Sequence, residues 1–250
     1  MKQLAHLTWT DVERIKKDRP VGVLPIGAVE AHGPHLPLET DMIIAEEMAR
    51  RSATALEEKG LPTLILPKVA YSVTRFGEAF PGTVSIRYES AQSVLWDICA
   101  AVARTGFRCV VFANAHLEPA HRRVLKETAV AGTKELGIPI VFPDIARKKN
   151  AEKLTEEFRS GACHAGQFET SLVLAVRPEL VNDDVRRQLE PNRTNLAMKI
   201  KEGAQSFEEA GGPRAYFGDP GAATAEEGES TYRTLTEILL SATLDALRIE

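Results

Sequence analysis

Short apolar runs alternate along the chain with longer segments in which apolar residues recur at helical spacing. The runs predict strands at residues 21–26, 64–66, 108–113 and 138–142, with further extended chain at 83–86. The helical spacing predicts helices at 42–59, 90–104, 118–135, 169–176, 195–208 and 230–248. Strands that alternate with helices are typical of a mainly parallel sheet with helices on both faces. No repeat or composition shift marks a boundary, so we expect an α/β fold in a single domain over residues 1–250.

Two irregular segments interrupt this alternation. Residues 70–82 are expected to form a long loop, and residues 211–228 are rich in glycine. The second segment is too long for a simple connection between two helices, and we expect it to fold over a site.

Composition narrows the possible classes of function. The formal net charge is −4 and basic residues are not clustered, which argues against a nucleic-acid partner. No run approaches the ~20 apolar residues of a membrane span, and the first residues lack the apolar core of a signal peptide. The three cysteines, Cys99, Cys109 and Cys163, fit a reducing compartment better than a disulfide framework. These features predict a cytoplasmic protein without a membrane or nucleic-acid partner.

Candidate chemistry is concentrated after the strand at 21–26. Glu30 and His32 are two positions apart, so their side chains point the same way on an extended segment. Asp41 follows at the expected start of a helix, where it caps the helix, bridges two metal ions with its two oxygens, or does both. His35 either orients a metal ligand or only satisfies loop backbone groups. Ligands bind at the carboxyl ends of strands in open α/β sheets, so this loop predicts a metal site.

Two later segments repeat this pattern. His116 and Glu118 follow the third expected strand, with Asn114 placed to hold the turn. His164 lies at a loop-to-helix junction, where a histidine can exchange a proton near pH 7. Glu169 opens an otherwise apolar helix, so its carboxylate needs a metal or a hydrogen bond. The structural alternatives are a hydrogen-bonded loop histidine and acidic residues that interact with a helix N-terminus.

The sequence lacks the motifs of several other chemistries. It has no glycine-rich phosphate loop after a strand, no Gly-x-Ser-x-Gly elbow and no zinc-finger spacing of cysteines. Five of the six histidines instead fall in the three segments just described, if His121 is included. The chain is therefore predicted to hold a divalent metal site and to be a hydrolase.

The same segments carry a family resemblance. The first reads LPIGAVEAHGPHLPLETD over residues 24–41, and it is followed in order by FPGTVS (80–85), NAHLE (114–118), HAGQFETS (164–171) and GDP (218–220). Together these motifs resemble the creatininase (creatinine amidohydrolase) family across nearly the whole chain. The resemblance implies a three-layer α/β/α fold, usually hexameric, with two divalent ions, Zn²⁺ or Mn²⁺.

The resemblance also implies two groups of metal ligands that share one carboxylate. These groups are Glu30, Asp41 and His116 for one ion, and His32, Asp41 and Glu118 for the other. Some members lack a carboxylate at the position of Glu118 and use the later glutamate, here Glu169. This chain has both, so either completes the second group. His164 and Glu169 are the expected catalytic residues, with His164 passing a proton to the leaving group.

Two departures from the family pattern bear on the substrate. Gln167 replaces a glutamate that usually follows the His-Ala-Gly motif, and Leu117 stands where creatininase has a tyrosine. We expect Leu117, Gly166 and Gln167 to contact the substrate. Without the aromatic residues that close the creatininase pocket, we expect a more polar pocket and poor turnover of creatinine.

The favoured function is hydrolysis of a C–N bond in a small cyclic or linear amide. Two ions would lower the pKa of a bridging water molecule and polarise the carbonyl group. Alternatives with the same metal site are a formamide deformylase, a peptidase-like enzyme and a hydrolase that opens a keto-inositol ring. A non-catalytic metal-binding protein is a remote alternative, because every expected ligand is present. The expected partners are a small-molecule substrate and further copies of the chain in a homo-oligomer.

Overall fold

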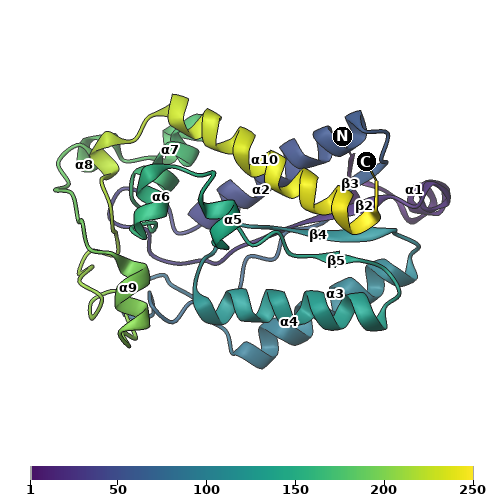
Figure 1. Ribbon diagram of the computed structural model, residues 1–250, viewed down its shortest axis with the longest axis horizontal. Coiled ribbons are helices and arrows are strands. Elements are labelled where there is room, and N and C mark those ends of the chain that lie inside the picture. Colours follow the sequence, from purple (N-terminus) through teal and green to yellow (C-terminus); the bar gives the residue numbers. More distant parts are fainter. Residues whose placement is uncertain (1, 250) are drawn as a thin grey trace.

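The computed structural model describes residues 2–249. Its centre is a five-stranded parallel sheet in the order β1-β3-β2-β4-β5 (Figure 1). The strands are β1 (Lys2–Gln3), β2 (Val21–Ile26), β3 (Thr63–Ile65), β4 (Cys109–Asn114) and β5 (Ile140–Val141). The two longest strands, β2 and β4, are neighbours and are paired along their whole length.

Helices cover both faces of the sheet. On one face lie α2 (Thr40–Glu58), α7 (Gln167–Val176) and α10 (Ala225–Leu247), and on the other lie α3 (Tyr88–Arg104) and α4 (Pro119–Glu135) (Figure 1). The shorter helices are α1 (Trp9–Ile15), α5 (Lys148–Ala151), α6 (Glu156–Ser160), α8 (Asp183–Arg186) and α9 (Leu196–Lys201), with 3-10 turns at Leu4–His6, Lys16–Asp18, Pro178–Leu180 and Pro220–Ala222. This arrangement confirms the expected three-layer α/β/α fold. Within residues 2–249, no helix is both long and apolar enough to cross a membrane.

Both faces of the central strands are buried. In β4, Val111 packs with residues of α2, α7 and α10, whereas Phe112 packs with residues of α3 and α4. Side chains alternate between the two faces of a strand, so a strand covered on both sides has a nearly continuous apolar sequence. The sequences VGVLPI in β2 and CVVFAN in β4 have this pattern, which is why the sequence predicted both strands.

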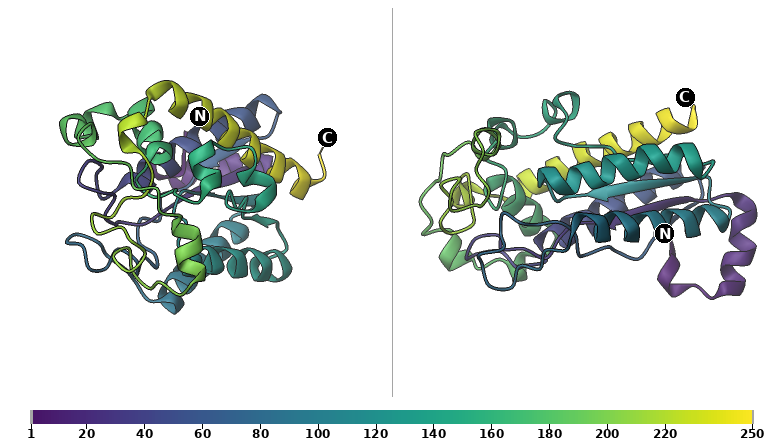
Figure 2. Two further views of the ribbon diagram at one scale, coloured as in Figure 1. Left: turned by 60° about the vertical axis from the view of Figure 1, so that its left-hand side comes forward. Right: turned by 90° about the horizontal axis from the view of Figure 1, so that it is seen from below.

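The winding of the sheet reverses at β2. The chain passes from β2 through α2 to β3 on one side, and then crosses through α3 to β4 on the other side of β2. The loops after β2 and β4 therefore leave from adjacent carboxyl ends, with Ile26 paired to Asn114, at the point where open α/β sheets bind ligands. Most of the short helices and irregular segments lie at this end. It is on the left in Figure 1, and also on the left in the second of the two views in Figure 2.

The expected extended segment at 83–86 is not a strand of the sheet. The backbone N–H of Val84 donates instead to the carbonyl of Val29 at 2.9 Å, and that of Ile86 to Ser72 at 3.0 Å. These bonds connect loops to one another, so the segment satisfies its backbone without a ladder partner.

The helix expected at 195–208 is also shorter in the structure. It ends at Lys201, and Gly203 then adopts a φ of 107°, which no right-handed helix can contain. In the other direction, α10 begins at Ala225, several residues before the expected start at 230. The pattern missed β1, α1, α5, α6 and α8, because elements this short show no clear periodicity.

Candidate metal centre and pocket

The first turn of α2 packs directly against the end of β2. Gly27 permits this contact, because a Cβ atom at this position would lie 2.6 Å from the Cβ atom of Asp41. The backbone N–H of Ala28 donates to Oδ2 of Asp41 at 3.1 Å. The helix begins at Thr40 with Glu39 as its N-cap, so Asp41 is not the capping residue and lies in the first turn. The buried carboxylate of Asp41 is thereby fixed at the carboxyl edge of the sheet.

Six buried side chains meet at this edge. Their candidate ligand atoms form three overlapping groups, and within each group all atoms lie within 4.8 Å of one another. The groups are Glu30–Asp41–His116, His32–Asp41–Glu169 and Glu30–His32–His164. The three segments that the sequence singled out therefore converge on one site.

His116 presents one ring nitrogen to two carboxylates. Its Nε2–H donates to the carbonyl of Val73 at 2.9 Å, so Nδ1 carries the lone pair of the neutral ring. Nδ1 lies 3.0 Å from Oε1 of Glu30 and 3.1 Å from Oδ2 of Asp41. Thr74 donates its hydroxyl hydrogen to the other oxygen of Glu30. A lone pair so close to two carboxylates is stable only with a proton or a cation between them.

His32 has a similar arrangement with its ring reversed. Its Nδ1–H donates to the backbone carbonyl of Glu30 at 3.1 Å. Its Nε2 is buried without a hydrogen-bond partner, 3.5 Å from Oδ1 of Asp41 and 3.6 Å from Oε2 of Glu169. Buried polar atoms almost always have a partner, and a metal ion among these three side chains would supply it.

Without an ion, protons can balance the charges of this cluster. Burial opposes a charge on His32, but Asp41 and Glu169 outweigh it and raise its pKa to about 10. Burial likewise opposes a charge on His116, and its carboxylate neighbours raise its pKa well above the usual value. Burial raises the pKa of Glu169 to about 8. Burial would also raise the pKa of Glu30, but His116 outweighs it and lowers that pKa to about 2. A cluster that holds protons at neutral pH can exchange them for a divalent ion.

The two carboxylates considered for the second metal group occupy different places. Oε2 of Glu169 accepts the N–H of Ala165 at 2.6 Å and lies 3.6 Å from Nε2 of His32. Glu118 accepts the N–H of Phe76 at 3.3 Å, and it stands outside the three groups formed by the described residues. Burial raises the pKa of Glu118, whose side chain lines the pocket described below.

His164 lies between the carboxylates and an aromatic ring. Its Nε2–H donates to the carbonyl of Ala31 at 3.0 Å, and its Nδ1 lies 3.9 Å from Oε1 of Glu30. The ring stacks on Phe207 with centroids 4.1 Å apart. The N–H of Phe217 donates to the carbonyl of His164 at 2.8 Å, which fixes the backbone. Burial lowers the pKa of His164 to about 4, so the ring is neutral and Nδ1 has a free lone pair.

A buried polar chain supports the turn that carries His116. Asn114 donates from Nδ2 to the carbonyl of His116 at 2.7 Å and accepts from Nε2–H of His121 at 2.7 Å. Nδ1 of His121 accepts the hydroxyl hydrogen of Ser72 at 2.6 Å. The chain therefore fixes the backbone between β4 and α4.

His35 joins the loop after β2 to α7. Its Nε2 is hydrogen-bonded to Oγ1 of Thr170 at 3.0 Å, beside Glu169 in the sequence. Its carbonyl accepts the N–H of Asn182 at 2.8 Å. Among residues 2–249 it belongs to none of the three candidate metal groups, so its contacts are those of a supporting residue.

Glu157 of α6 holds two loops together behind the site. One carboxylate oxygen accepts the N–H of Phe168 at 2.8 Å, and the other accepts the N–H of Asp219 at 2.7 Å. Gly166 and Gly218 leave the space that this carboxylate needs, because a Cβ atom on either would collide with it. The start of α7 and the loop before α10 are therefore positioned by one side chain.

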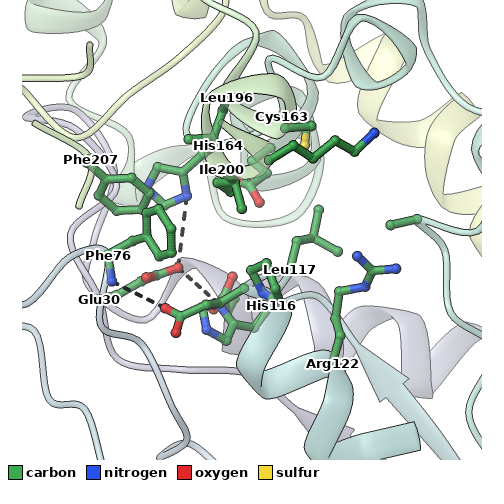
Figure 3. Close-up of a pocket in the computed structure, with 17 residues that line it drawn as sticks. Glu30, Phe76, His116, Leu117, Arg122, Cys163, His164, Leu196, Ile200 and Phe207 are labelled. Carbon is green, nitrogen blue, oxygen red and sulfur yellow. Dashed lines mark hydrogen bonds and ion pairs between the residues drawn. The ribbon is translucent and has the colours of Figure 1, made fainter. Parts of the chain in front are cut away.

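A pocket of about 220 Å³ opens over the candidate metal ligands (Figure 3). Its walls come from the loop at 70–82, the start of α4, and α9 with the segment after it. Several of its walls are apolar, formed by Phe76, Leu117, Leu196, Ile200 and Phe207. The expectation of a more polar pocket is wrong, because Phe76 and Phe207 supply aromatic walls from outside the family motifs considered.

The three residues expected at the substrate differ in their placement. Leu117 lines the pocket. Gly166 packs against Glu157, and Gln167 donates a hydrogen bond to Glu227 of α10. In the described structure neither Gly166 nor Gln167 lines the pocket.

The glycine-rich segment 211–228 also lies away from the described pocket lining. Its Phe217 instead forms a backbone bridge with His164 and supports that residue from behind. The residue of the wall that stacks on His164 is Phe207, which is not among the site residues predicted from the sequence. Phe207 lies outside the motifs, so nothing in the sequence pattern marked it.

Comparison with known proteins agrees with this geometry. The family model Creatininase, described as creatinine amidohydrolase, matches residues 5–243. A solved structure described as "Creatininase Mn" has a TM-score of 0.75 and 24% sequence identity, with 97% of both chains covered. This likeness shows that the two chains share a fold.

Curated relatives match over most of the sequence. A mycofactocin precursor peptide peptidase of Mycobacterium ulcerans is 30% identical over 248 residues, which cover 95% of this chain and 90% of the relative. A creatinine amidohydrolase of Pseudomonas putida is 29% identical over 194 residues, which cover 72% of this chain and 74% of the relative. The chain therefore belongs to the creatininase (creatinine amidohydrolase) family of metal-dependent amidohydrolases.

Proposed function

We propose that this enzyme binds two divalent ions and hydrolyses the C–N bond of a small amide. The ligands of one ion would be Glu30, Asp41 and His116, and those of the other His32, Asp41 and Glu169. The proposal rests on the position of Asp41 between two histidines. Its Oδ2 lies 3.1 Å from Nδ1 of His116, and its Oδ1 lies 3.5 Å from Nε2 of His32. One carboxylate thus has a separate oxygen for each ion.

The donor set suits the metals that the family resemblance implies. Imidazole nitrogens mixed with carboxylate oxygens are typical ligands of Zn²⁺ and are also used by Mn²⁺. In this proposal Glu169 completes the second group, and Glu118 remains at the pocket wall beside the first. Two divalent ions bound here would lower the pKa of a water molecule and polarise the amide carbonyl.

His164 would move the proton that the reaction requires. Its Nε2–H is held by the carbonyl of Ala31, so Nδ1 is the atom that accepts and releases a proton. The ring of Phe207 keeps this histidine in one orientation and excludes water from one of its faces. The leaving nitrogen takes the proton as the C–N bond breaks, which is general acid catalysis.

Metal analysis combined with an activity assay tests the proposal. Protein purified without chelators should contain about two ions per chain, the number expected for a two-metal hydrolase. Removing them with EDTA should abolish hydrolysis of small amides, and adding Zn²⁺ or Mn²⁺ should restore it. A metal content near zero with no activation by either ion would overturn the proposal.

The proposal extends to the setting in which the enzyme acts. We place it in the cytoplasm as a homo-oligomer that acts on a small-molecule substrate. The three cysteines are free thiols in the structure, and Cys99 and Cys109 are buried, which suits a reducing compartment. Light scattering on the purified protein determines the number of subunits, and a monomer would contradict this part of the proposal.

A further inference from the structure

The walls of the pocket indicate which amides the site accepts. We propose that the substrate is an N-acyl amino acid whose leaving amine carries an apolar side chain and a free carboxylate. Hydrolysis would add water across the C–N bond, so the acyl carbon gains the oxygen and the nitrogen leaves with a hydrogen as the free amino acid. This inference rests on the function proposed above and adds the identity of the leaving group.

The apolar side chain of the proposed leaving amine is inferred from the residues around His164, the proposed proton donor. Phe207 stacks on His164, so an aromatic wall lies beside the place where the leaving nitrogen takes its proton. Phe76 lies next to Phe207, with ring centroids 6.0 Å apart. Leu196 and Ile200 are one turn apart on α9 and line the same pocket. A leaving amine would therefore have its side chain among apolar groups.

The free carboxylate of the proposed leaving amine is inferred from two positively charged side chains that line the pocket, Arg122 and Lys201. Nε and Nη2 of Arg122 donate to the two carboxylate oxygens of Asp144 at 3.1 and 2.7 Å, which holds the guanidinium group in place. Lys201 also lines the pocket and has no ion pair with a described residue, whereas Lys199 on the same helix pairs with Glu202 at 2.8 Å. Asp144 balances the charge of Arg122, so the charge of Lys201 remains for an anionic ligand. Glu118, the carboxylate of the pocket wall outside the proposed metal groups, accepts the N–H of Phe76 instead.

The arrangement of these groups fits one extended leaving group. Figure 3 shows Arg122 on the opposite side of the pocket from Phe207 and Glu30, with Ile200 near the middle and Leu196 above His164. A leaving group that begins at His164 and runs along Ile200 would end near Arg122, and Lys201 follows Ile200 at the end of α9. The carboxylate of an amino acid is the anionic group at that end.

Three matched substrates separate the two parts of this inference in the metal-loaded enzyme. N-acetyl-leucine has both features, N-acetyl-isoamylamine lacks only the carboxylate, and N-acetylglycine lacks only the side chain. We expect kcat/KM for N-acetyl-leucine to exceed that for N-acetylglycine by about 10- to 100-fold, the scale of burying one aliphatic side chain. We expect kcat/KM for N-acetyl-leucine to exceed that for N-acetyl-isoamylamine by about 2- to 5-fold, the scale of a partly exposed ion pair.

Variants of α9 test the role of the lysine. Lys201→Gln should raise KM for N-acetyl-leucine about 2- to 5-fold more than it raises KM for N-acetyl-isoamylamine, which lacks the carboxylate. Lys199→Gln is the matched control, because Lys199 lies on the same helix but is not among the described residues that line the pocket. Equal kcat/KM values for all three substrates, or equal effects of the two variants, would overturn the inference and leave the proposed amidohydrolase in place. Failure of the metal-loaded enzyme to hydrolyse any amide would overturn both.

Discussion

The ring of Phe207 is stacked on the ring of His164, with the two planes inclined at 26°. This contact holds the imidazole in one orientation beside the carboxylate cluster. We predict that Phe207→Leu retains the metal ions but lowers kcat/KM by about 2- to 12-fold, which corresponds to the ~0.5–1.5 kcal/mol of one aromatic contact. Steady-state kinetics on any hydrolysed amide, together with metal analysis, measure both quantities.

The matched control for this prediction is Phe80→Leu. Phe80 also packs against Phe207, with centroids 6.4 Å apart, but it is not among the described residues that line the pocket. The control should therefore lose less activity than Phe207→Leu. Equal losses would mean that general packing of this segment, rather than contact with His164, sets the rate.

His164→Ala should keep both ions and lose about 10²- to 10⁴-fold in kcat, the usual scale of general acid–base catalysis. The reason is that neither group proposed to hold an ion contains His164, whose ring instead lines the pocket and stacks on Phe207. Metal content and kcat should be measured on the same preparation. If metal and activity are lost in parallel, His164 is a ligand and the assignment as proton carrier is wrong.

Three carboxylate variants distinguish the ligands from the pocket wall. Asp41→Ala removes a ligand from both proposed ions and should lose the most metal. Glu169→Ala should lose about one ion, whereas Glu118→Ala should retain both, because Glu118 lies outside the groups formed by residues 2–249. Elemental mass spectrometry measures how much metal each variant retains, and circular dichroism confirms that each variant is folded. Retention of both ions by Glu169→Ala and loss by Glu118→Ala would reverse the assignment.

Metal uptake should release protons and weaken as the pH falls. In the metal-free protein Asp41 and Glu169 outweigh burial and raise the pKa of His32 to about 10, and burial raises that of Glu169 to about 8. Both groups therefore hold protons at neutral pH and must lose them before they can coordinate an ion. The apparent affinity should rise with pH through this range. Calorimetry in two buffers of different ionisation enthalpy should give different binding enthalpies, and identical values would contradict the prediction.

The convergence of the candidate ligands could be predicted because the strands are easy to recognise. β2 and β4 are apolar along almost their whole length, and each is followed within six residues by histidine and carboxylate side chains. In a parallel sheet, adjacent strands bring such loops together without further information. The pairing of Ile26 with Asn114 is the register that does so here.

The remaining features depend on contacts that no local pattern encodes. Whether Glu169 or Glu118 lies beside His32 is determined by the orientation of α7, which depends on distant residues such as Glu157. A more polar pocket was expected because Leu117 replaces an aromatic residue of creatininase, whereas the aromatic walls come from Phe76 and Phe207 outside the motifs. Phe207 comes from an irregular segment after α9, and only the folded chain brings it against His164.

A last prediction concerns Glu157, whose two oxygens accept the N–H groups of Phe168 and Asp219. In Glu157→Gln one oxygen becomes an NH₂ group, which cannot accept either hydrogen, so one backbone N–H loses its partner. We expect the free energy of unfolding to fall by about 1–3 kcal/mol, the cost of a buried unsatisfied donor. Because Phe168 precedes Glu169 at the start of α7, the second ion should also be bound more weakly. Glu156→Gln is the control: the neighbouring side chain is exposed, and its change should stay within about 0.5 kcal/mol. Denaturant unfolding and metal titration of both variants test this prediction. Equal unfolding midpoints and equal metal affinities for the two variants would show that Glu157 does not position α7.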